Sequence, residues 1–166
     1  MKVISGGQTG VDQGGLRAAR ACGIETGGTA PKGWLTEDGP APWLADYGLV
    51  EHESLTYPPR TEANVRDSDA TIWIGNPRSP GARLTLRMSQ THKKPLFWVP
   101  KAWVLPDEPS IHSHAMCVAN VKHWLLWDHF QVVNVAGNRE SSNPGIGKAA
   151  EAFLTEVFRK WKEQAK

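Results

Sequence analysis

The chain has 166 residues, of which 40% are hydrophobic and 22% are charged, a balance that excludes a disordered protein and allows one domain with its own core. A formal net charge of +2 is well short of the basic surface of a dedicated nucleic-acid binder, and no apolar run is long enough to span a bilayer. The two cysteines lack metal-ligand or disulfide spacing and a strand pattern follows Met1 directly, so we expect a cytoplasmic protein without a bound metal ion.

The first elements expected along the chain are a strand, a turn and a helix. Residues 2–5 have the pattern of a short strand, and residues 5–10 form a glycine-rich turn. Thr9 and Asp12 have the spacing of a capping box, which predicts that a helix starts there. Gly23 follows the apolar stripe of this helix and is typical of a helix carboxyl terminus.

The next segment, residues 26–55, is rich in Gly and Pro. We expect it to form a long functional loop with at most one short strand, because such loops often cover ligands. A short helix is expected over residues 61–67, where Glu62 and Arg66 have the spacing of an i, i+4 ion pair. The apolar run 70–75 is the clearest buried strand in the sequence.

The second half of the chain continues the alternation of helices and strands. We expect a helix to about residue 91, a strand over 95–99, a proline-bearing connection over 101–109, a helix over 114–130 and a strand over 131–136. Ser142 or Asn143 is expected to cap the last helix, with Pro144 in its first turn. This alternation predicts a single domain over residues 1–166 of class α/β: a Rossmann-like three-layer α/β/α fold with a mainly parallel sheet of about five strands.

The strongest candidate for a binding site is the glycine-rich turn between the first strand and the first helix. Glycines let backbone N–H groups approach a ligand, and a helix N-terminus adds positive potential, so the turn predicts a phosphate cradle. Its spacing is neither that of a dinucleotide-binding loop nor that of a Walker A loop. The alternative is a tight turn that needs glycine only for packing. The candidate ligand-binding residues in the turn are Ser5, Gly6, Gly7, Gln8, Thr9 and Gly10.

Two further polar segments adjoin predicted strands. Arg60, Asn64 and Arg66 precede the buried strand, and they are candidates for contacts with a ligand phosphate, base or sugar. The alternative there is a solvated helix face with an internal ion pair. Gly137 and Arg139 follow the last strand, at the carboxyl edge where open α/β sheets bind ligands. The alternative there is a loop whose polar groups only cap the following helix.

A series of short blocks in one order covers nearly the whole chain: Ile4-Ser5-Gly6-Gly7-Gln8-Thr9-Gly10-Val11-Asp12, Pro31-Lys32-Gly33, Glu37-Asp38-Gly39, Arg60-Thr61, Asn64-Val65-Arg66-Asp67-Ser68-Asp69-Ala70, Lys94-Pro95, Asn134-Val135-Ala136-Gly137, Arg139-Glu140-Ser141 and Pro144-Gly145-Ile146. This series resembles the molybdenum carrier family, the circularly permuted YpsA-like branch of the SLOG superfamily. The blocks are long enough that coincidence does not explain them.

The resemblance implies a Rossmann-like fold and a nucleotide-type or pterin-type ligand held by the glycine loops. It brings Lys32 and Gly81 into the candidate ligand-binding set. Relatives called molybdenum cofactor carriers bind the phosphorylated pterin dithiolene cofactor without transforming it. More distant relatives, the lonely-guy proteins, cleave the N-glycosidic bond of nucleoside monophosphates.

The chain departs from the family at one place. Where the family has Thr-Gly-Gly-Thr followed by a catalytic Glu in the lonely-guy proteins, this chain has Ser79-Pro80-Gly81-Ala82 with Arg87. An arginine does not act as a base at neutral pH, so the change argues against hydrolysis. The loop at residues 79–82 also keeps only one of the family's two glycines, so it lacks the full second phosphate cradle. The positive charge of Arg83 or Arg87 is left to take over that role.

We therefore expect a non-catalytic binder of a phosphorylated nucleotide-like or pterin-like small molecule, with the molybdenum cofactor or a nucleotide as its ligand. No nucleic acid or membrane is expected as a partner, and the fold allows homo-oligomers. One alternative is a nucleotide N-glycosidase in which Glu37, Asp38 or Glu62 is the acid, and another is a nucleotide-sensing module. On the binding hypothesis, Gly7→Asp abolishes binding while leaving the fold intact.

Overall fold

The computed structural model describes residues 1–105, 114–127 and 129–165, and its centre is a parallel β-sheet of six strands. The sheet order is β5–β2–β1–β8–β6–β7, and each paired neighbour is parallel. The strands are β1 (Lys2–Ile4), β2 (Glu25–Ala30), β5 (Leu49–Glu51), β6 (Ala70–Ile74), β7 (Leu96–Val99) and β8 (Val132–Gly137).

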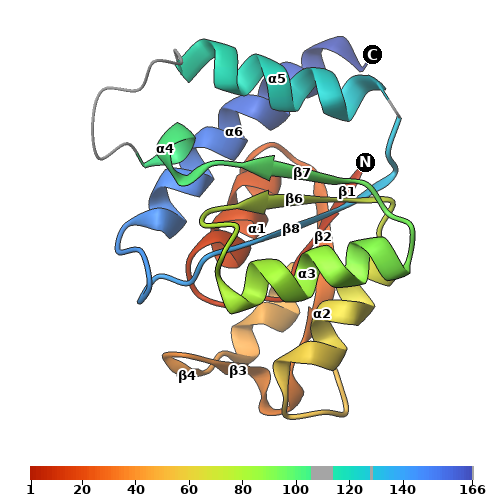
Figure 1. The fold of residues 1–166 in the computed structure, drawn as a ribbon, viewed down its shortest axis with the longest axis vertical. Helices are drawn as coiled ribbons and strands as arrows, with labels where there is room; N and C mark the ends of the chain where they lie inside the picture. Colours follow the sequence, from red (N-terminus) through yellow and green to blue (C-terminus); the bar gives the residue numbers. More distant parts are fainter. Residues whose placement is uncertain (106–113, 128, 166) are drawn as a thin grey trace.

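Helices cover both faces of the sheet, which confirms the predicted three-layer α/β/α fold (Figure 1). One face carries α1 (Val11–Ala21), α4 (Lys101–Val104), α5 (His114–Trp127) and α6 (Ile146–Gln164), and the other carries α2 (Tyr57–Arg66) and α3 (Pro80–Thr91). Residues 106–109 of the expected connection lie outside the described residues. Among the described helices, none is long and apolar enough to cross a membrane.

The expectation of a long loop over residues 26–55 is wrong, and this is why the sheet has six strands rather than about five. The segment contains most of β2, the β3–β4 hairpin (Leu35–Thr36 and Gly39–Pro40), two 3₁₀-helices (Lys32–Trp34 and Pro42–Tyr47) and β5. In β2, Gly28 stands where the backbone just after β1 passes very close to it. A Cβ on Gly28 would lie 2.1 Å from the carbonyl oxygen of Ser5. Glycine in a strand can therefore mark a close backbone approach.

Two expected helix caps are replaced by other contacts. The helix after the glycine-rich turn has Gly10 as its N-cap and no side-chain cap, so the capping box of Thr9 and Asp12 is absent there. The last helix begins at Ile146 after Gly145, not at the expected caps Ser142 or Asn143. The carboxylate of Glu140 accepts hydrogen bonds from the backbone N–H groups of Gly145 and Gly147.

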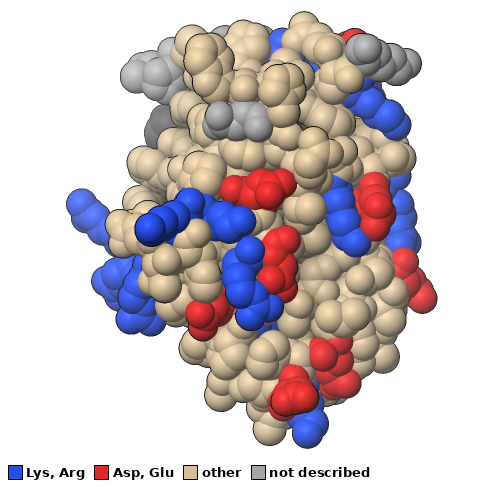
Figure 2. Space-filling model, turned by 90° about the vertical axis from the view of Figure 1, so that its right-hand side faces the viewer, with Lys and Arg blue, Asp and Glu red and all other residues tan. Residues whose placement is uncertain are grey.

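The predicted ion pair between Glu62 and Arg66 is also replaced. Glu62 contacts His92 at 3.0 Å, and Arg66 pairs with the adjacent Asp67 at 2.7 Å. On the face of the molecule shown in Figure 2, basic and acidic side chains are interspersed over the middle of the surface.

Helices α1 and α6 pack closely because glycine stands at their contact. A Cβ on Gly14 would lie 2.4 Å from the carbonyl oxygen of Gly147, which is less than any ordinary contact distance. In an exposed helix, a change from glycine to alanine stabilises by up to about 1 kcal/mol.

Here we expect the opposite sign for Gly14→Ala, because the added methyl forces the two helices apart. The free energy of unfolding, measured by urea denaturation, should fall by about 1–3 kcal/mol, as in other overpacked cores. Equal or greater stability of the variant would show that the two helices are not in this contact.

Candidate functional site

The candidate site lies at the carboxyl edge of the sheet, between β8 and β6. The chain runs from β1 through α1 to β2 on one side of the sheet, and from β6 through α3 to β7 on the other. The last strand, β8, lies between β1 and β6. Open α/β sheets bind ligands at such a point, where the direction of the connections reverses.

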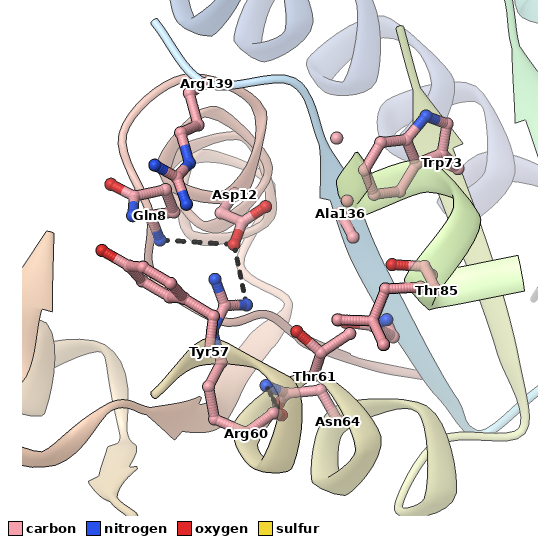
Figure 3. Close-up of a pocket in the computed structure, with 14 residues that line it drawn as sticks. Gln8, Asp12, Tyr57, Arg60, Thr61, Asn64, Trp73, Thr85, Ala136 and Arg139 are labelled. Atoms are coloured by element: carbon pink, nitrogen blue, oxygen red, sulfur yellow. Dashed lines mark hydrogen bonds and ion pairs between the residues drawn. The ribbon is translucent and has the colours of Figure 1, made fainter. Parts of the chain in front are cut away.

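A cleft at this point is enclosed by α2, α3 and the ends of β6 and β8. Its inner chamber has a volume of about 90 Å³ and is lined by residues that include Gln8, Asp12, Arg60 and Asn134 (Figure 3). Its outer chamber has a volume of about 320 Å³ and reaches the start of α3. The two chambers share four lining residues, so they form one cleft of a size that suits a small ligand. The shared residues are Trp73, Gly81, Gly137 and Arg139.

A buried ion pair forms one wall of the inner chamber. Arg60 of α2 lies 3.4 Å from the carboxylate of Asp12 in α1, and the two residues are 9% and 3% exposed. The guanidinium lies against the backbone of Gly6, where a Cβ would be 1.6 Å from it. Burial raises the pKa of Asp12, while the Arg60 charge and the backbone N–H groups of Gln8 and Gly137 oppose that rise. The charge of Arg60 therefore offsets part of the free-energy cost of burying the Asp12 carboxylate.

A second arginine gives the lining of the cleft one more cation than carboxylate, and outside the lining the charge of Arg139 also helps to lower the pKa of Glu37. The guanidinium of Arg139 lies 4.7 Å from the centre of the Tyr57 ring, and that of Arg60 lies 5.5 Å from the same ring. Among the described lining residues, Asp12 is the one carboxylate that faces these two cations. Arg139 is half-buried, and its guanidinium can donate charge-assisted hydrogen bonds to an anionic ligand.

Several buried polar atoms in the cleft have no hydrogen-bond partner among the described residues. They belong to side chains between 2% and 9% exposed. Buried polar groups in folded proteins are nearly always paired, so such atoms call for an explanation. The unpartnered atoms in the cleft are Gln8 Nε2, Arg60 Nε, Trp73 Nε1 and Asn134 Oδ1.

The β3–β4 hairpin is tied to the glycine-rich turn beside the cleft. The side-chain oxygen of Gln8 accepts hydrogen bonds from the backbone N–H groups of Thr9 and Glu37, at 3.0 and 2.9 Å. The carboxylate of Glu37 accepts hydrogen bonds from the Thr9 hydroxyl, and from the backbone N–H (3.0 Å) and hydroxyl of Ser141. Partial burial alone would raise the pKa of Glu37, but these hydrogen bonds from Ser141 and Thr9 lower it overall.

The structure brings together about half of the ligand-binding residues expected from sequence. Gln8, Arg60, Asn64 and Gly81 line the cleft, together with Gly137 and Arg139. The amide of Asn64 is occupied with the backbone of Thr29 and Arg60, so it holds α2 against β2. Two expected residues, Lys32 and Arg66, are exposed and do not line either chamber.

The other residues of the glycine-rich turn are buried behind the cleft. The Ser5 hydroxyl donates to the carbonyl of Val135 at 2.7 Å, and Thr9 contacts Glu37. A Cβ on Gly7 would lie 2.7 Å from Leu44, and one on Gly10 would lie 2.5 Å from the carbonyl oxygen of Asn138. The expectation that Gly7→Asp leaves the fold intact is therefore wrong, because its side chain would enter a packed core.

Sequence reasoning passed over Tyr57 and Trp73 for the site, included Asn134 only as part of the segment 134–141, and assigned Asp12 to a helix cap. The available signal was a polar group inside an apolar strand. Trp73 stands in the buried strand β6 and Asn134 in the buried strand β8. Their register places Thr71 opposite Asn134 and Trp73 opposite Ala136, on the sheet face that α2 and α3 cover.

The carboxylates considered for hydrolysis point elsewhere. Glu37 binds Thr9 and Ser141, Glu62 contacts His92, and Asp38 is exposed. Arg83 and Arg87 are exposed on α3, and neither lines the described cleft. In the part of the chain that the structure describes, no three His, Cys, Asp or Glu side chains gather as a metal site would require.

Comparison with known proteins gives one family and one similar structure. Residues 3–158 match the circularly permuted YpsA SLOG family. A crystal structure described as a "Putative molybdenum carrier protein" from Syntrophus aciditrophicus SB is similar, with a TM-score of 0.82 and 36% sequence identity over 95% of this chain and 93% of that one. No curated protein matches significantly. If β8 is numbered as the first strand and β1, β2, β5, β6 and β7 follow it, the sheet order β5–β2–β1–β8–β6–β7 becomes 4-3-2-1-5-6. A circular permutation that moves β8 to the end of the chain therefore accounts for the observed order.

The hydrogen bonds of Glu37 predict a pH dependence of the hairpin. A carboxyl whose pKa is lowered in the folded protein stabilises the fold above its unfolded pKa of about 4.3, and this contribution is lost as the pH falls through the folded value. The protection of the hairpin amides from hydrogen exchange, relative to the exchange of an unfolded chain at the same pH, should therefore fall below about pH 4 in the natural protein. Glu37→Gln should reduce this pH dependence, and an unchanged profile would contradict the contact.

The Asp12–Arg60 pair predicts coupled effects on stability. Arg60→Met should lower the free energy of unfolding by about 3–5 kcal/mol, because it leaves a buried carboxylate without its partner. Asp12→Asn in the Arg60→Met background should cost much less than Asp12→Asn alone, with a coupling energy of about 0.5–3 kcal/mol. Additive losses in urea denaturation would show that the two side chains do not interact.

Proposed function

The chain belongs to the circularly permuted YpsA SLOG family, and from that membership we propose that it binds a phosphorylated small molecule in the cleft, in the manner of a carrier and without catalysis. The observation that carries the proposal is the excess positive charge of the cleft. Two arginines, Arg60 and Arg139, face the single lining carboxylate of Asp12. An anionic group would neutralise the second cation.

The outer chamber is the better place for the phosphate. It adjoins the N-terminus of the twelve-residue helix α3, where the hydroxyl oxygen of Ser79 caps the backbone N–H of Ala82. Helix N-termini favour anions because the helix dipole is positive there. At this one Pro80 has no N–H and Ala82 donates to Ser79, so the N–H of Gly81 is the donor left in the first three positions of the helix. Gly81, Ser142 and Arg139 also line this chamber. The proposal therefore moves the phosphate from the glycine-rich turn, which is packed shut, to the start of α3.

The residues of the cleft fit a phosphorylated pterin or nucleotide. The polar residues Gln8, Thr61 and Asn134 line the inner chamber beside the aromatic rings of Tyr57 and Trp73, and Arg139 offers a charged fork to a phosphate. If the molybdenum cofactor is the ligand, its dithiolene would hold the metal, while these side chains hold the ring and the phosphate. The similar crystal structure, described as a molybdenum carrier, supports this class of ligand.

Binding without reaction is supported by the placement of the candidate acids. Glu37 and Glu62 are engaged with other side chains outside the cleft, and α3 presents Leu84 and Thr85 to the inner chamber rather than a carboxylate. A glycosidase would need an acid that reaches the leaving group. Release of free base from a nucleoside monophosphate would favour the alternative enzyme, with Asp12 as the nearest carboxylate.

A matched pair of variants at Gly81 tests the phosphate site. The residue is exposed, and an added Cβ meets the Trp73 ring at 3.3 Å, so Asp and Asn at this position face the same modest crowding. Gly81→Asp should weaken binding of guanosine 5′-monophosphate, neopterin monophosphate and ribose 5-phosphate by about tenfold or more, because it places a negative charge beside the phosphate.

Gly81→Asn is the control, and it should bind within about threefold of the natural protein, since it differs from Asp only in charge. Isothermal titration calorimetry measures both variants, and native mass spectrometry of protein made in a host that synthesises the molybdenum cofactor identifies any copurified ligand. Equal affinities for the Asp and Asn variants would exclude an anion at the start of α3.

A further inference from the structure

One wall of the outer chamber is a tight turn after β8, over residues 139–143. Two of its residues, Arg139 and Ser142, line the chamber. The backbone N–H of Asn143 donates to the carbonyls of Arg139 and Glu140, both at 3.2 Å, and so closes the turn. A closed turn moves as a unit, so its orientation determines where the guanidinium of Arg139 lies.

The turn is fixed at its base and at its apex by different parts of the chain. At the base, the side chain of Asn138 accepts the backbone N–H of Asn76 at 2.7 Å, which ties the end of β8 to the loop after β6. At the apex, Ser141 donates its backbone N–H (3.0 Å) and its hydroxyl to the carboxylate of Glu37. In the described chain, residues 139–142 make no other hydrogen bond outside the turn and the start of α6. The β3–β4 hairpin therefore holds the apex.

The charge of Glu37 does not suit an anion site, which makes its position informative. Partial burial alone would raise the pKa of Glu37, but the hydrogen bonds from Ser141 and Thr9 and the charge of Arg139 lower it overall. The group is therefore a carboxylate at neutral pH, and it repels an anion that binds beside Arg139. If charge were its whole influence, removing Glu37 would tighten the binding of a phosphate.

We infer that Glu37 is a positioning residue of the phosphate site: it holds Ser141, and with it the turn that presents Arg139 and Ser142 to the outer chamber. The inference rests on the proposed function, because the turn has to face a phosphate for its position to matter. The hairpin lines neither chamber, so it acts on the ligand only through this contact. Coupling between two sites is reciprocal, so a ligand that requires the turn in place also favours the attached hairpin.

Two matched variants of the hairpin separate positioning from charge. Glu37→Gln should weaken the binding of guanosine 5′-monophosphate, neopterin monophosphate and ribose 5-phosphate by about tenfold, and by the same factor for each, because the three share the phosphate. Asp38→Asn removes the same charge from the next residue, which is exposed and has no hydrogen bond to Ser141 among the described contacts. It should bind within about threefold of the natural protein in calorimetry.

A second pair of variants tests the other partner of the contact. Ser141→Ala should weaken binding about three- to tenfold, whereas Ser141→Thr keeps the hydroxyl and should bind within about threefold of the natural protein. In the Glu37→Gln background, Ser141→Ala should add little further loss, because the contact is already broken. Additive losses would show that the two residues act separately.

Hydrogen exchange gives a readout that a merely structural role would not change. Saturating amounts of the tightest-binding of the three phosphate compounds should raise the protection of the hairpin amides of the natural protein more than that of the amides of α5, on the other side of the sheet. In Glu37→Gln, the ligand should no longer raise the protection of the hairpin selectively. A structural role alone lowers hairpin protection equally with and without ligand.

Three results would overturn the inference. If folded Glu37→Gln binds as tightly as the natural protein or more tightly, Glu37 does not position the turn, although the phosphate site tested at Gly81 survives. If Glu37→Gln and Asp38→Asn weaken binding equally, the effect does not pass through Ser141. If none of the three compounds binds to the folded natural protein, the proposed function fails together with the inference.

Discussion

The contact on which the site depends is the one between Arg60, Asp12 and the bare backbone of Gly6. The guanidinium lies where any side chain at Gly6 would be, and it pairs with a carboxylate that is itself buried. This contact joins α2 to α1 and to the turn after β1, so it holds three separate parts of the chain around the inner chamber. It also leaves Arg139 as the cation that a ligand can neutralise.

The glycine-rich turn has a different role from the one that its composition suggests. Its glycines permit close packing: Gly7 against Leu44, Gly10 against the loop after β8, and Gly6 beneath Arg60. The turn supports the wall of the cleft, while the start of α3 and Arg139 face the outer chamber. Glycine lets a backbone approach a neighbour closely whether that neighbour is a ligand or another part of the protein.

The cleft also contains polar groups that reduce the stability of the fold. Four polar side chains that line the inner chamber each have one buried atom without a hydrogen-bond partner among the described residues, which lowers stability. Site residues often sacrifice stability in this way. The backbone N–H of Glu37 donates a hydrogen bond to the side-chain oxygen of Gln8, which connects this chamber to the β3–β4 hairpin.

Local patterns in the sequence determined the fold class, the order of most elements and the edge of the sheet where the site lies, because strand alternation and helix periodicity are local properties. Arg60, Asn64, Gly137 and Arg139 were identified for the same reason: they adjoin the ends of strands. Only the tertiary structure decided that residues 25–30 and 49–51 are strands, that Arg66 turns outward, and that Asp12, Tyr57, Trp73 and Asn134 converge. Those outcomes depend on which distant segments meet, and neither the closeness of β1 to β2 nor the pairing of Arg60 with Asp12 is encoded in the spacing of neighbouring residues.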